Sequence, residues 1–305
     1  MTSPAATKPL RVGAEALAAK GWWRTNRWLL ARRATQVAVL LLFLVGPWFG
    51  LWIVKGNLAS SLTLGVLPLT DPYVLLQSLL AGLWGRHVPL ASALIGAAIV
   101  LGFYLLVGGR VYCSWVCPLN PVTDLAAWLR RRLGLRSGAV LSRQMRHWLL
   151  AMTLVVAAVS GSIAWELVNP VSMLHRGLLF GFGAGAAVIV ALFLFDLFVA
   201  PRGWCGHLCP VGAFYSLPAH LSPLRVVAAR REACNDCADC YAVCPEPLVI
   251  KPALKAVDGA GPVITSAQCT NCARCIDVCS KQVFEFGLRV SRARPAAARP
   301  TAVHP

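Results

Sequence analysis

Four long apolar stretches set the pattern of the chain. They cover residues 34–54, 88–108, 148–168 and 178–200, and the middle of each contains no Lys or Arg. A helix needs about 20 mostly apolar residues to cross the hydrocarbon core of a bilayer. Pro47, within the first stretch, is tolerated in a membrane helix because neighbouring groups satisfy the freed backbone. The pattern therefore predicts a polytopic α-helical membrane protein with four transmembrane helices.

A shorter apolar stretch, residues 73–84, cannot span a bilayer as a helix. Asp71 is suited to cap a helix in which Pro72 is the first residue. At about 3.6 residues per turn, the leucines of this stretch share one face and Gln77 lies on the other. We expect an amphipathic helix that lies along the outer surface of the membrane.

Composition agrees with a membrane location, and charge gives its orientation. Charged residues make up 13% of the chain, against about 25% in soluble domains. The net charge is +17; segments 1–33 and 109–147 carry seven Lys or Arg each, whereas loops 55–87 and 169–177 carry three in all. Positive charge marks cytoplasmic loops. We therefore expect a multi-pass protein of the bacterial inner membrane, with both termini cytoplasmic and the charge facing membrane lipid, and no nucleic-acid partner.

The pair Arg32-Arg33, just before the first apolar stretch, has two interpretations. It resembles a twin-arginine export signal, or it is the positive flank of a membrane helix. No convincing small-residue cleavage site follows the apolar stretch. We therefore favour the positive flank and expect the segment to remain as a membrane anchor.

Eight of the twelve cysteines follow the spacing of two-cluster bacterial ferredoxins. Each of two runs has three Cys separated by two residues and a fourth after three more, which Pro245 follows in the first run and Ser280 in the second. In this spacing the fourth Cys ligates the other cluster. Zinc prefers isolated Cys pairs, and a reducing compartment disfavours disulfides. We therefore assign two [4Fe–4S] clusters, one to Cys234, Cys237, Cys240 and Cys279, the other to Cys269, Cys272, Cys275 and Cys244.

These patterns divide the chain into segments of different composition. The soluble C-terminal part is predicted to be a two-cluster bacterial-type ferredoxin domain of the α+β class, and the basic, Ala- and Pro-rich tail is predicted to be disordered. The expected segments are a basic cytoplasmic arm (1–33), the membrane domain (34–200), a linker (201–227), the ferredoxin domain (228–288) and the tail (289–305).

The other four cysteines belong to a duplicated motif, Arg-x-(Tyr or Trp)-Cys-x3-Cys-Pro. Its Cys-x3-Cys-Pro parts are residues 113–118 and 205–210, each at the expected cytoplasmic end of a span. An offset of four residues puts both thiols of a copy on one helix face. The four thiols can hold a metal, form a dithiol–disulfide switch, support the soluble clusters, or only pack as small buried side chains. The candidates for a redox relay are Cys113, Cys117, Cys205 and Cys209, and His207 is a fifth ligand or a hydrogen-bonded interface residue.

Acidic residues close to membrane spans are costly and therefore suggest function. If the protein oxidises a quinol, two protons leave with two electrons, and a carboxylate or imidazole is the natural acceptor. The candidates are Glu166, His175 and, on the same expected side, Asp71. In the alternative, Glu166 only reaches to the interface and Asp196 pairs with a nearby arginine such as Arg202. The sequence has no catalytic triad signature, phosphate loop or dinucleotide fingerprint.

The pattern as a whole resembles the NapH family, ferredoxin-type quinol dehydrogenase subunits associated with periplasmic nitrate reductase. The segments that carry the resemblance are 20–24, 46–50, 68–72, 113–121, 169–172, 205–212 and both cluster runs. The resemblance implies a quinol-oxidising electron-transfer subunit that uses ubiquinol or menaquinol from the quinone pool. Its electrons would pass to the periplasmic ferredoxin NapG, then to a di-haem cytochrome and the molybdenum nitrate reductase.

Cytoplasmic clusters and a periplasmic acceptor leave a gap of about 30 Å of hydrocarbon. The sequence has no Cys-x-x-Cys-His haem motif. Quinone, the thiols of the duplicated motif or a partner's cofactor would have to carry electrons across this gap, unless electrons bypass the clusters. Relatives that share the Cys-x3-Cys-Pro pairs suggest an alternative, a ferredoxin-type membrane protein for assembly or metal handling of a respiratory or methylamine-oxidising enzyme.

Overall fold

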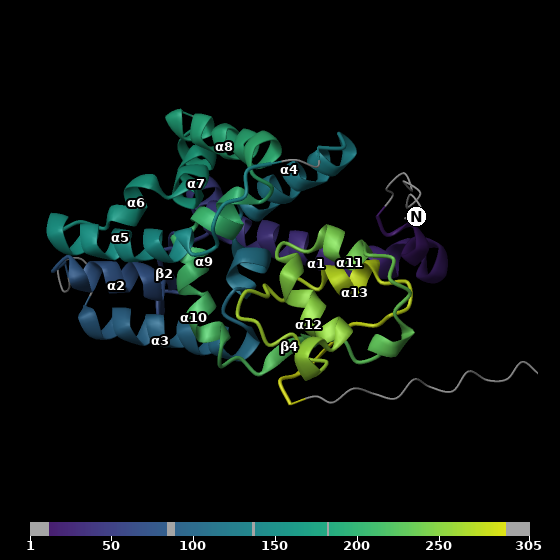
Figure 1. Ribbon diagram of the computed structural model, residues 1–305. Helices are drawn as coiled ribbons and strands as arrows, with labels where there is room; N and C mark the ends of the chain where they lie inside the picture. Colours follow the sequence, from purple (N-terminus) through teal and green to yellow (C-terminus); the bar gives the residue numbers. More distant parts are fainter. Residues whose placement is uncertain (1–11, 84–88, 136–137, 182, 291–305) are drawn as a thin grey trace, which may run out of the picture. The chain divides into compact units, whose positions relative to one another are not determined.

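The computed structural model describes residues 12–83, 89–135, 138–181 and 183–290 (Figure 1). The chain forms two compact units. The larger unit consists of residues 30–225 and 265–272, and the smaller unit consists of residues 1–29, 226–264 and 273–305. Most of the expected basic arm therefore belongs to the same unit as most of the ferredoxin region. The predicted disordered tail lies, from residue 291 onward, outside the described residues.

The first helix is longer than the apolar pattern predicts. α1 (Ala14–Phe49) begins 20 residues before the expected start, because the basic segment is rich in Ala, Leu, Lys and Arg, which favour a helix. The helix departs from helical geometry at Gly21, where φ is 77°. Glycine tolerates this left-handed backbone because it has no Cβ.

The second apolar stretch forms one uninterrupted helix, whereas the third and fourth do not. α3 (Leu90–Val107) lies within two residues of its predicted bounds. The third stretch breaks at Gly161, between α5 (Met145–Ser160) and α6 (Ala164–Val168). The fourth breaks between α7 (Pro170–Phe180) and α8 (Ala184–Leu194), and α8 continues into the π-helical turn η2 (Phe195–Val199).

Two helices in the described part of the chain, α1 and α3, are long and apolar enough to cross a membrane. α5 and the continuous segment of α8 and η2 are apolar but shorter. Four uninterrupted spanning helices are therefore not confirmed. Glycine accounts for the interruptions: Gly161 and Gly181 both adopt positive φ, at 63° and 94°, a backbone conformation that ends a helix.

The helix after Asp71 begins where the sequence predicts, but its surroundings differ. α2 (Pro72–Leu80) has Asp71 as its N-cap, with the Asp71 carboxylate accepting a hydrogen bond from the Tyr73 amide. The predicted polar face of this helix is not exposed at Gln77. α2 packs against α3 and α5 (Figure 1), and Gln77, expected on the polar face, is fully buried. Burial is possible because the Gln77 side-chain oxygen accepts a hydrogen bond from the Trp165 amide at 3.1 Å.

A small antiparallel sheet, which the hydrophobic pattern did not predict, lies between α1 and α2 in sequence. Its strands are β1 (Val54–Gly56), β2 (Ser60–Thr63) and β3 (Leu67–Thr70), paired in that order. β3 runs close to α3, since a Cβ on Gly96 would lie 2.8 Å from the Pro68 carbonyl oxygen. Because β3 ends one residue before Asp71, this sheet fixes the position of that carboxylate.

The rest of the larger unit contains the duplicated cysteine motif. The first copy forms a π-helical turn followed by a helix, and the second repeats this order. The elements are η1 (Tyr112–Val116), α4 (Asn120–Arg132), η3 (Trp204–Leu208), α9 (Pro210–Phe214), α10 (Ser216–Ala219) and the start of β4 (Leu224–Val227). The apolar core beside them is mostly aromatic and contains Tyr73, Tyr104, Tyr112, Trp165 and Tyr215.

The smaller unit has the short helices and small sheet of a ferredoxin. α11 (Asp239–Val243) and α13 (Arg274–Val278) each contain the third cysteine of a run. β4 pairs with β5 (Glu285–Leu288) in a two-stranded sheet. The remaining elements are η4 (Arg231–Ala233), η5 (Pro247–Val249), α12 (Ile250–Lys255) and η6 (Val257–Gly259).

The N-terminal segment is held to the smaller unit by hydrogen bonds between residues more than 200 positions apart. The Gly13 amide donates to Asp239 at 2.9 Å, and Lys20 donates to the Ile276 carbonyl at 2.8 Å. The fully buried Asp277 carboxylate accepts from the amides of Trp28 and Leu29. This part of the chain is therefore structured, and its role is not limited to marking membrane topology.

Candidate functional site: a cavity lined by four cysteines

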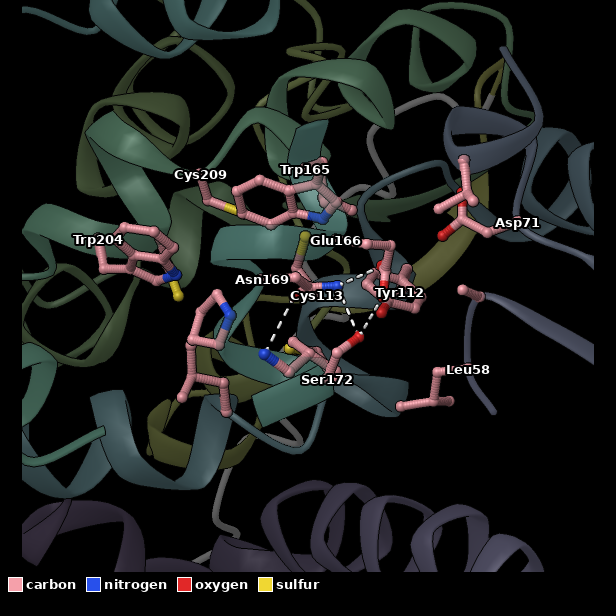
Figure 2. A pocket seen from close by; sticks show the side chains of 18 residues that line it. Leu58, Asp71, Tyr112, Cys113, Trp165, Glu166, Asn169, Ser172, Trp204 and Cys209 are labelled. Atoms are coloured by element: carbon pink, nitrogen blue, oxygen red, sulfur yellow. Dashed lines mark hydrogen bonds between the residues drawn. The ribbon is translucent and has the colours of Figure 1, made fainter. Parts of the chain in front are cut away.

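The four cysteines of the duplicated motif line one cavity of the larger unit (Figure 2). The cavity has a volume of about 40 Å³, which is room for a few water molecules. Asp71 and Glu166 line the same cavity. The structure thus brings together two sets of residues that the sequence suggested separately, the duplicated cysteines and two of the three candidate proton acceptors.

The two motifs adopt the same local structure, which positions their thiols. In each copy the amide of the second Cys donates to the carbonyl five residues earlier, Cys117 to Tyr112 and Cys209 to Trp204, both at 2.9 Å. This is the wider turn of a π-helix, which occurs mostly at functional sites. A Cβ on Gly212 would lie 3.9 Å from the Cys113 sulfur and 3.7 Å from the Cys205 carbonyl oxygen, so the two copies are in close proximity.

Two buried arginines donate hydrogen bonds to the backbone of the second copy of the motif. Arg110 and Arg146 are 2% and 1% exposed. Arg110 donates to the Cys205 carbonyl at 3.2 Å, and Arg146 donates to the Gly206 carbonyl at 3.1 Å. Both also bind the side-chain oxygen of Gln268. Both guanidinium groups favour the ionised form of the Cys113 thiol, because opposite charges attract strongly where water is excluded.

The four cysteines are partly buried, and burial raises the pKa of each thiol. The pKa of Cys209 rises to about 12, chiefly by burial and then by the nearby Cys113, while Arg110 opposes the rise. Burial also raises the pKa of Cys113, although Arg110 and Arg146 lower it. A thiol with a raised pKa is a poor nucleophile for disulfide exchange, whereas a bound metal removes the thiol proton. The environment of the four thiols therefore disfavours a dithiol–disulfide switch.

Asp71 is a buried acid of the cysteine cavity. The side chain is 8% exposed, and burial raises the pKa of its carboxyl group to about 6. Its hydrogen bonds to the amides of Tyr73 and Val74 oppose the rise, and the charge of Glu166 adds to it. A carboxylate with a pKa near 6 can take up a proton close to neutral pH, as a general base requires.

The other two candidate proton acceptors occupy different environments. Glu166 in α6 accepts hydrogen bonds from Asn169 at 2.9 Å and from Ser172 at 2.7 Å (Figure 2). His175 in α7 is buried, packs edge-on against Phe43 and is not among the residues that line the cysteine cavity. Burial lowers the pKa of His175. The structure therefore groups Asp71 with Glu166 and sets His175 apart.

The structure also shows the surroundings of Asp196, Arg202 and His207. The Asp196 carboxylate accepts a hydrogen bond from the Trp204 amide at 3.0 Å, and so supports the second π-helical turn. The Arg202 guanidinium, considered as its partner, forms an ion pair with Asp124 at 3.0 Å. His207 lies within η3. Asp196 therefore contributes to the shape of the cysteine site through a backbone contact.

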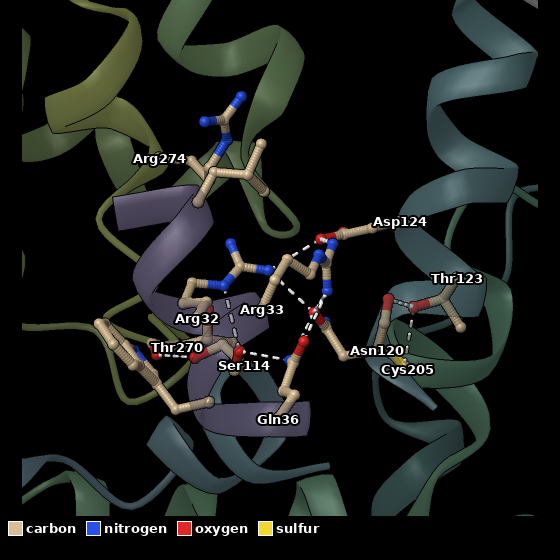
Figure 3. Close-up of polar contacts among 12 residues, drawn as sticks. Arg32, Arg33, Gln36, Ser114, Asn120, Thr123, Asp124, Cys205, Thr270 and Arg274 are labelled. Atoms are coloured by element: carbon tan, nitrogen blue, oxygen red, sulfur yellow. Dashed lines mark hydrogen bonds and ion pairs between the residues drawn. The ribbon is translucent and has the colours of Figure 1, made fainter. Parts of the chain in front are cut away.

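Asp124 organises a polar cluster near the cysteines, which Figure 3 shows. It forms ion pairs with Arg32, Arg33 and Arg202 at 2.8, 2.6 and 3.0 Å. These arginines hold the pKa of the Asp124 carboxyl group well below its usual range, against the effect of burial. The pair Arg32-Arg33 therefore has a structural role in joining α1 to α4.

Four ferredoxin cysteines also line one cavity. Cys234, Cys237, Cys240 and Cys279, the set assigned to one cluster from their spacing, line a cavity of about 50 Å³ in the smaller unit. The other set has Cys269 and Cys272 in the larger unit and Cys244 and Cys275 in the smaller unit.

The backbone repeats between the two cysteine runs. Asp236 and Ala238 have φ of 55° and 62°, and the equivalent Asn271 and Ala273 have φ of 46° and 57°. Successive amides in such turns form concave sites that suit iron–sulfur clusters. Among the described residues, no three His, Cys, Asp or Glu side chains gather closely enough for a single metal ion. A four-iron cluster holds its ligand sulfurs further apart than a single ion does, and the four cysteines around the cavity of the smaller unit fit such a cluster.

Sequence reasoning missed several residues of the cysteine site. Arg146 lies in a basic loop whose charges were interpreted only as a topology signal, and no motif distinguished it. Gln268 precedes the second cysteine run without a signal of its own. Tyr112, by contrast, belongs to the duplicated motif and was noted there only as the shared aromatic residue.

Comparison with known proteins agrees with this site. Residues 90–136 and 179–226, which contain both copies of the motif, match the family described as "4Fe-4S binding domain", and residues 226–285 match "4Fe-4S dicluster domain". The ferredoxin-type protein NapH of Escherichia coli is 51% identical over 92% of this chain and 96% of its own length. The chain belongs to the NapH family of ferredoxin-type proteins.

Further relatives extend this family. NapH of Haemophilus influenzae is 47% identical over 93% of this chain and 98% of its own length. The methylamine utilization ferredoxin-type protein MauN of Paracoccus denitrificans is 54% identical over 92% of this chain and 96% of its own length. No solved structure matches the chain significantly.

Proposed function

We propose that this chain is a quinol-oxidising electron-transfer subunit of the bacterial inner membrane. It would take electrons from ubiquinol or menaquinol and deliver them, through iron–sulfur clusters, to a periplasmic ferredoxin of the NapG type. A di-haem cytochrome and the periplasmic nitrate reductase would follow. Both termini and the ferredoxin domain would be cytoplasmic, as the distribution of basic residues predicts.

One observation carries this proposal: a single cavity is lined by four duplicated cysteines together with Asp71 and Glu166. Oxidation of a quinol needs a proton acceptor and an electron acceptor close to one another. A buried carboxylate with a pKa of about 6 supplies the first. Thiols flanked by two buried arginines supply a place for the second.

The residues of the chain have separate tasks in this proposal. When bound, the [4Fe–4S] clusters accept electrons one at a time. The cluster ligands would be the eight ferredoxin cysteines in the two sets given above. Asp71 would take the proton of a quinol hydroxyl group, and Glu166, on the same cavity, would hold a second proton. The aromatic core around Tyr112 and Trp165 would keep bulk water out.

A second candidate rests on the identity to MauN of Paracoccus denitrificans, which at 54% is slightly higher than the 51% identity to NapH of Escherichia coli. In this candidate the chain serves methylamine oxidation, through electron transfer or through assembly of the enzyme. Complementation separates the two. Expression in a strain that lacks NapH would restore periplasmic nitrate reduction, or expression in a strain that lacks MauN would restore growth on methylamine. Rescue of the second strain alone would favour the methylamine pathway.

Electron paramagnetic resonance of the purified, cluster-loaded protein tests the main proposal. We expect reduced-cluster signals after addition of a water-soluble quinol, and none after addition of the corresponding quinone, which cannot donate electrons. The Cys237→Ser variant should lose one of the two ferredoxin signals, because the cavity of its set loses a ligand. If quinol reduces no cluster, either alone or with a NapG-type ferredoxin, the proposal is wrong.

A further inference from the structure

A second cavity of the larger unit lies between the two helices that could cross a membrane. α1 contributes Val39, Leu42 and Phe43 to its wall, and α3 contributes Val100 and Tyr104. Its volume is about 330 Å³, within the range of about 300–1,000 Å³ found for small-molecule sites. Leu42 is 41% exposed, whereas Phe43 and Tyr104 are buried. The cavity is therefore reachable from the apolar surface of these helices.

Polar side chains also line this cavity, among them Asn57, Ser61, Thr63 and Thr70. Asp71 lies there, and the hydrogen bond of the Tyr215 side chain to Asp71 lowers the pKa of the carboxyl group. The Tyr215 ring stacks on Tyr112 with centroids 5.1 Å apart, and Tyr104 packs edge-on at 5.0 Å. The three tyrosines and Asp71 are part of the polar lining of a mostly apolar cavity, a composition that suits an aromatic ring with hydroxyl groups and a hydrocarbon tail.

This cavity shares part of its wall with the cysteine cavity. Leu58, Asp71 and Tyr112 line both, and Tyr112 directly precedes Cys113 in sequence. Asp71 therefore faces a cavity accessible to lipid on one side and the four thiols on the other. A molecule bound to Asp71 in the larger cavity would contact residues that also line the cysteine cavity.

We propose that the cavity between α1 and α3 is the binding site for the ring of a membrane quinol. A ring hydroxyl group donates a hydrogen bond to the Asp71 carboxylate, and the isoprenoid tail leaves past Leu42 into the lipid. This inference rests on the proposed function and adds the location of the substrate. The chemistry of the wall excludes an anionic ligand, because its lining residues include the Asp71 carboxylate and no Lys or Arg.

Photoaffinity labelling of the full-length protein in lipid nanodiscs tests the site directly. The probe is an azido-ubiquinone, and excess decylubiquinone is the competitor. We expect competed labelling in peptides that contain residues 39–43, 54–71 or 100–116. Competed labelling confined to peptides outside these segments would overturn the proposal.

A matched pair of variants adds a test within one helix. Leu42 and Leu41 are neighbours on α1 with similar exposure, 41% and 46%, but only Leu42 is among the lining residues. Leu42→Trp should reduce competed labelling at least tenfold because the indole fills the mouth of the cavity. Leu41→Trp should leave it unchanged. Equal labelling of both variants would contradict the proposal, and the exposed positions keep either variant compatible with folding.

The same variants separate failure of the site from failure of the function. Labelling that maps to the cavity and is lost in Leu42→Trp establishes the site, even if quinol reduces no cluster; in that case the proposed function fails alone. Quinol-dependent cluster reduction that persists in Leu42→Trp, with competed labelling elsewhere, overturns the site and leaves the proposed function standing.

Discussion

At the scale of single residues, Asp71 has two tasks that require different properties. As the N-cap of α2 its oxygen must accept a hydrogen bond from the Tyr73 amide, which Asn can do as well as Asp. As a proton acceptor it must ionise, which Asn cannot do. The Asp71→Asn substitution therefore separates the structural task from the chemical one.

We predict that Asp71→Asn lowers the rate of quinol-dependent cluster reduction and removes an acid limb from its pH profile. In the native protein only the ionised carboxylate accepts a proton, and its pKa is raised to about 6. The native rate should therefore rise with pH through this value, and at pH 5 it should be about tenfold below its plateau. The variant should be slow and almost independent of pH between about pH 5 and 7.

Stopped-flow absorbance of the clusters gives both profiles, and the thermal unfolding temperature is the control for folding. The unfolding temperature should not change, because the amide side chain keeps the cap. A native acid limb that persists in Asp71→Asn would assign proton uptake to another group, and Glu166→Gln would then be the variant to measure.

Asp124 shows the opposite situation, a carboxylate that three arginines keep ionised. Its removal leaves Arg32, which is 1% exposed, without its ion pair in the protein interior. We predict that Asp124→Ala lowers the free energy of unfolding by about 3–5 kcal/mol, the usual effect of breaking a buried pair. Arg33→Ala removes a 28% exposed partner and should cost about 1 kcal/mol or less. Chemical unfolding in detergent measures both, and equal effects would contradict this assignment.

Residue types and spacing predicted the cysteines and carboxylates of this site, but not that they line one cavity. The Asp71 cap was predictable because Asp followed by Pro before an apolar run is a local signal. The meeting of Asp71, Glu166 and four cysteines was not, because these residues come from segments up to about 140 positions apart in sequence. The sequence did not identify Arg146, because a buried arginine cannot be distinguished from an exposed one by its position in a basic loop.

At the scale of elements, the duplicated motif is a π-helical turn that ends in proline. The residue after each second cysteine cannot donate a backbone hydrogen bond, so the turn closes and a new helix starts. Asp196 and the two buried arginines hold the backbone of the second copy through the Trp204 amide and the Cys205 and Gly206 carbonyls. Simple packing of small side chains would not require so many buried polar groups.

We predict that Cys113→Ser and Cys205→Ser each slow quinol-dependent cluster reduction at least tenfold. Both thiols line the cysteine cavity and neither belongs to a ferredoxin run. The paramagnetic signals of chemically reduced ferredoxin clusters should therefore remain largely intact. Normal quinol turnover in both variants would reduce the role of these cysteines to packing.

Local patterns predicted an element well only where its apolar residues form one uninterrupted stretch. α3 is continuously apolar, and its bounds were predicted within two residues. Residues 54–70 form three strands of three or four residues each, too short for a clear alternation. The third and fourth apolar stretches looked continuous because hydropathy does not register a glycine that turns the backbone, as Gly161 and Gly181 do.

At the scale of the whole molecule, the number of membrane crossings depends on whether the two interrupted apolar stretches cross the bilayer. α5 has 16 residues, a length of about 24 Å, which is short of the roughly 30 Å core. A bilayer thins locally around a short helix at modest cost, and broken helices are tolerated where protein covers the break. We therefore expect four crossings even though two helices meet the length criterion.

Reporter insertions decide between four crossings and two. Alkaline phosphatase, which is active only outside the cytoplasm, should be active after Gly65, a turn between β2 and β3, and inactive after Arg289 in either case. Insertion after Ser162, in the break between α5 and α6, separates the alternatives. With four crossings this position is periplasmic and the reporter is active; with two it is cytoplasmic and the reporter is inactive. Activity after Arg289 would reverse the orientation that the basic residues predict, and would restore the twin-arginine interpretation of Arg32-Arg33.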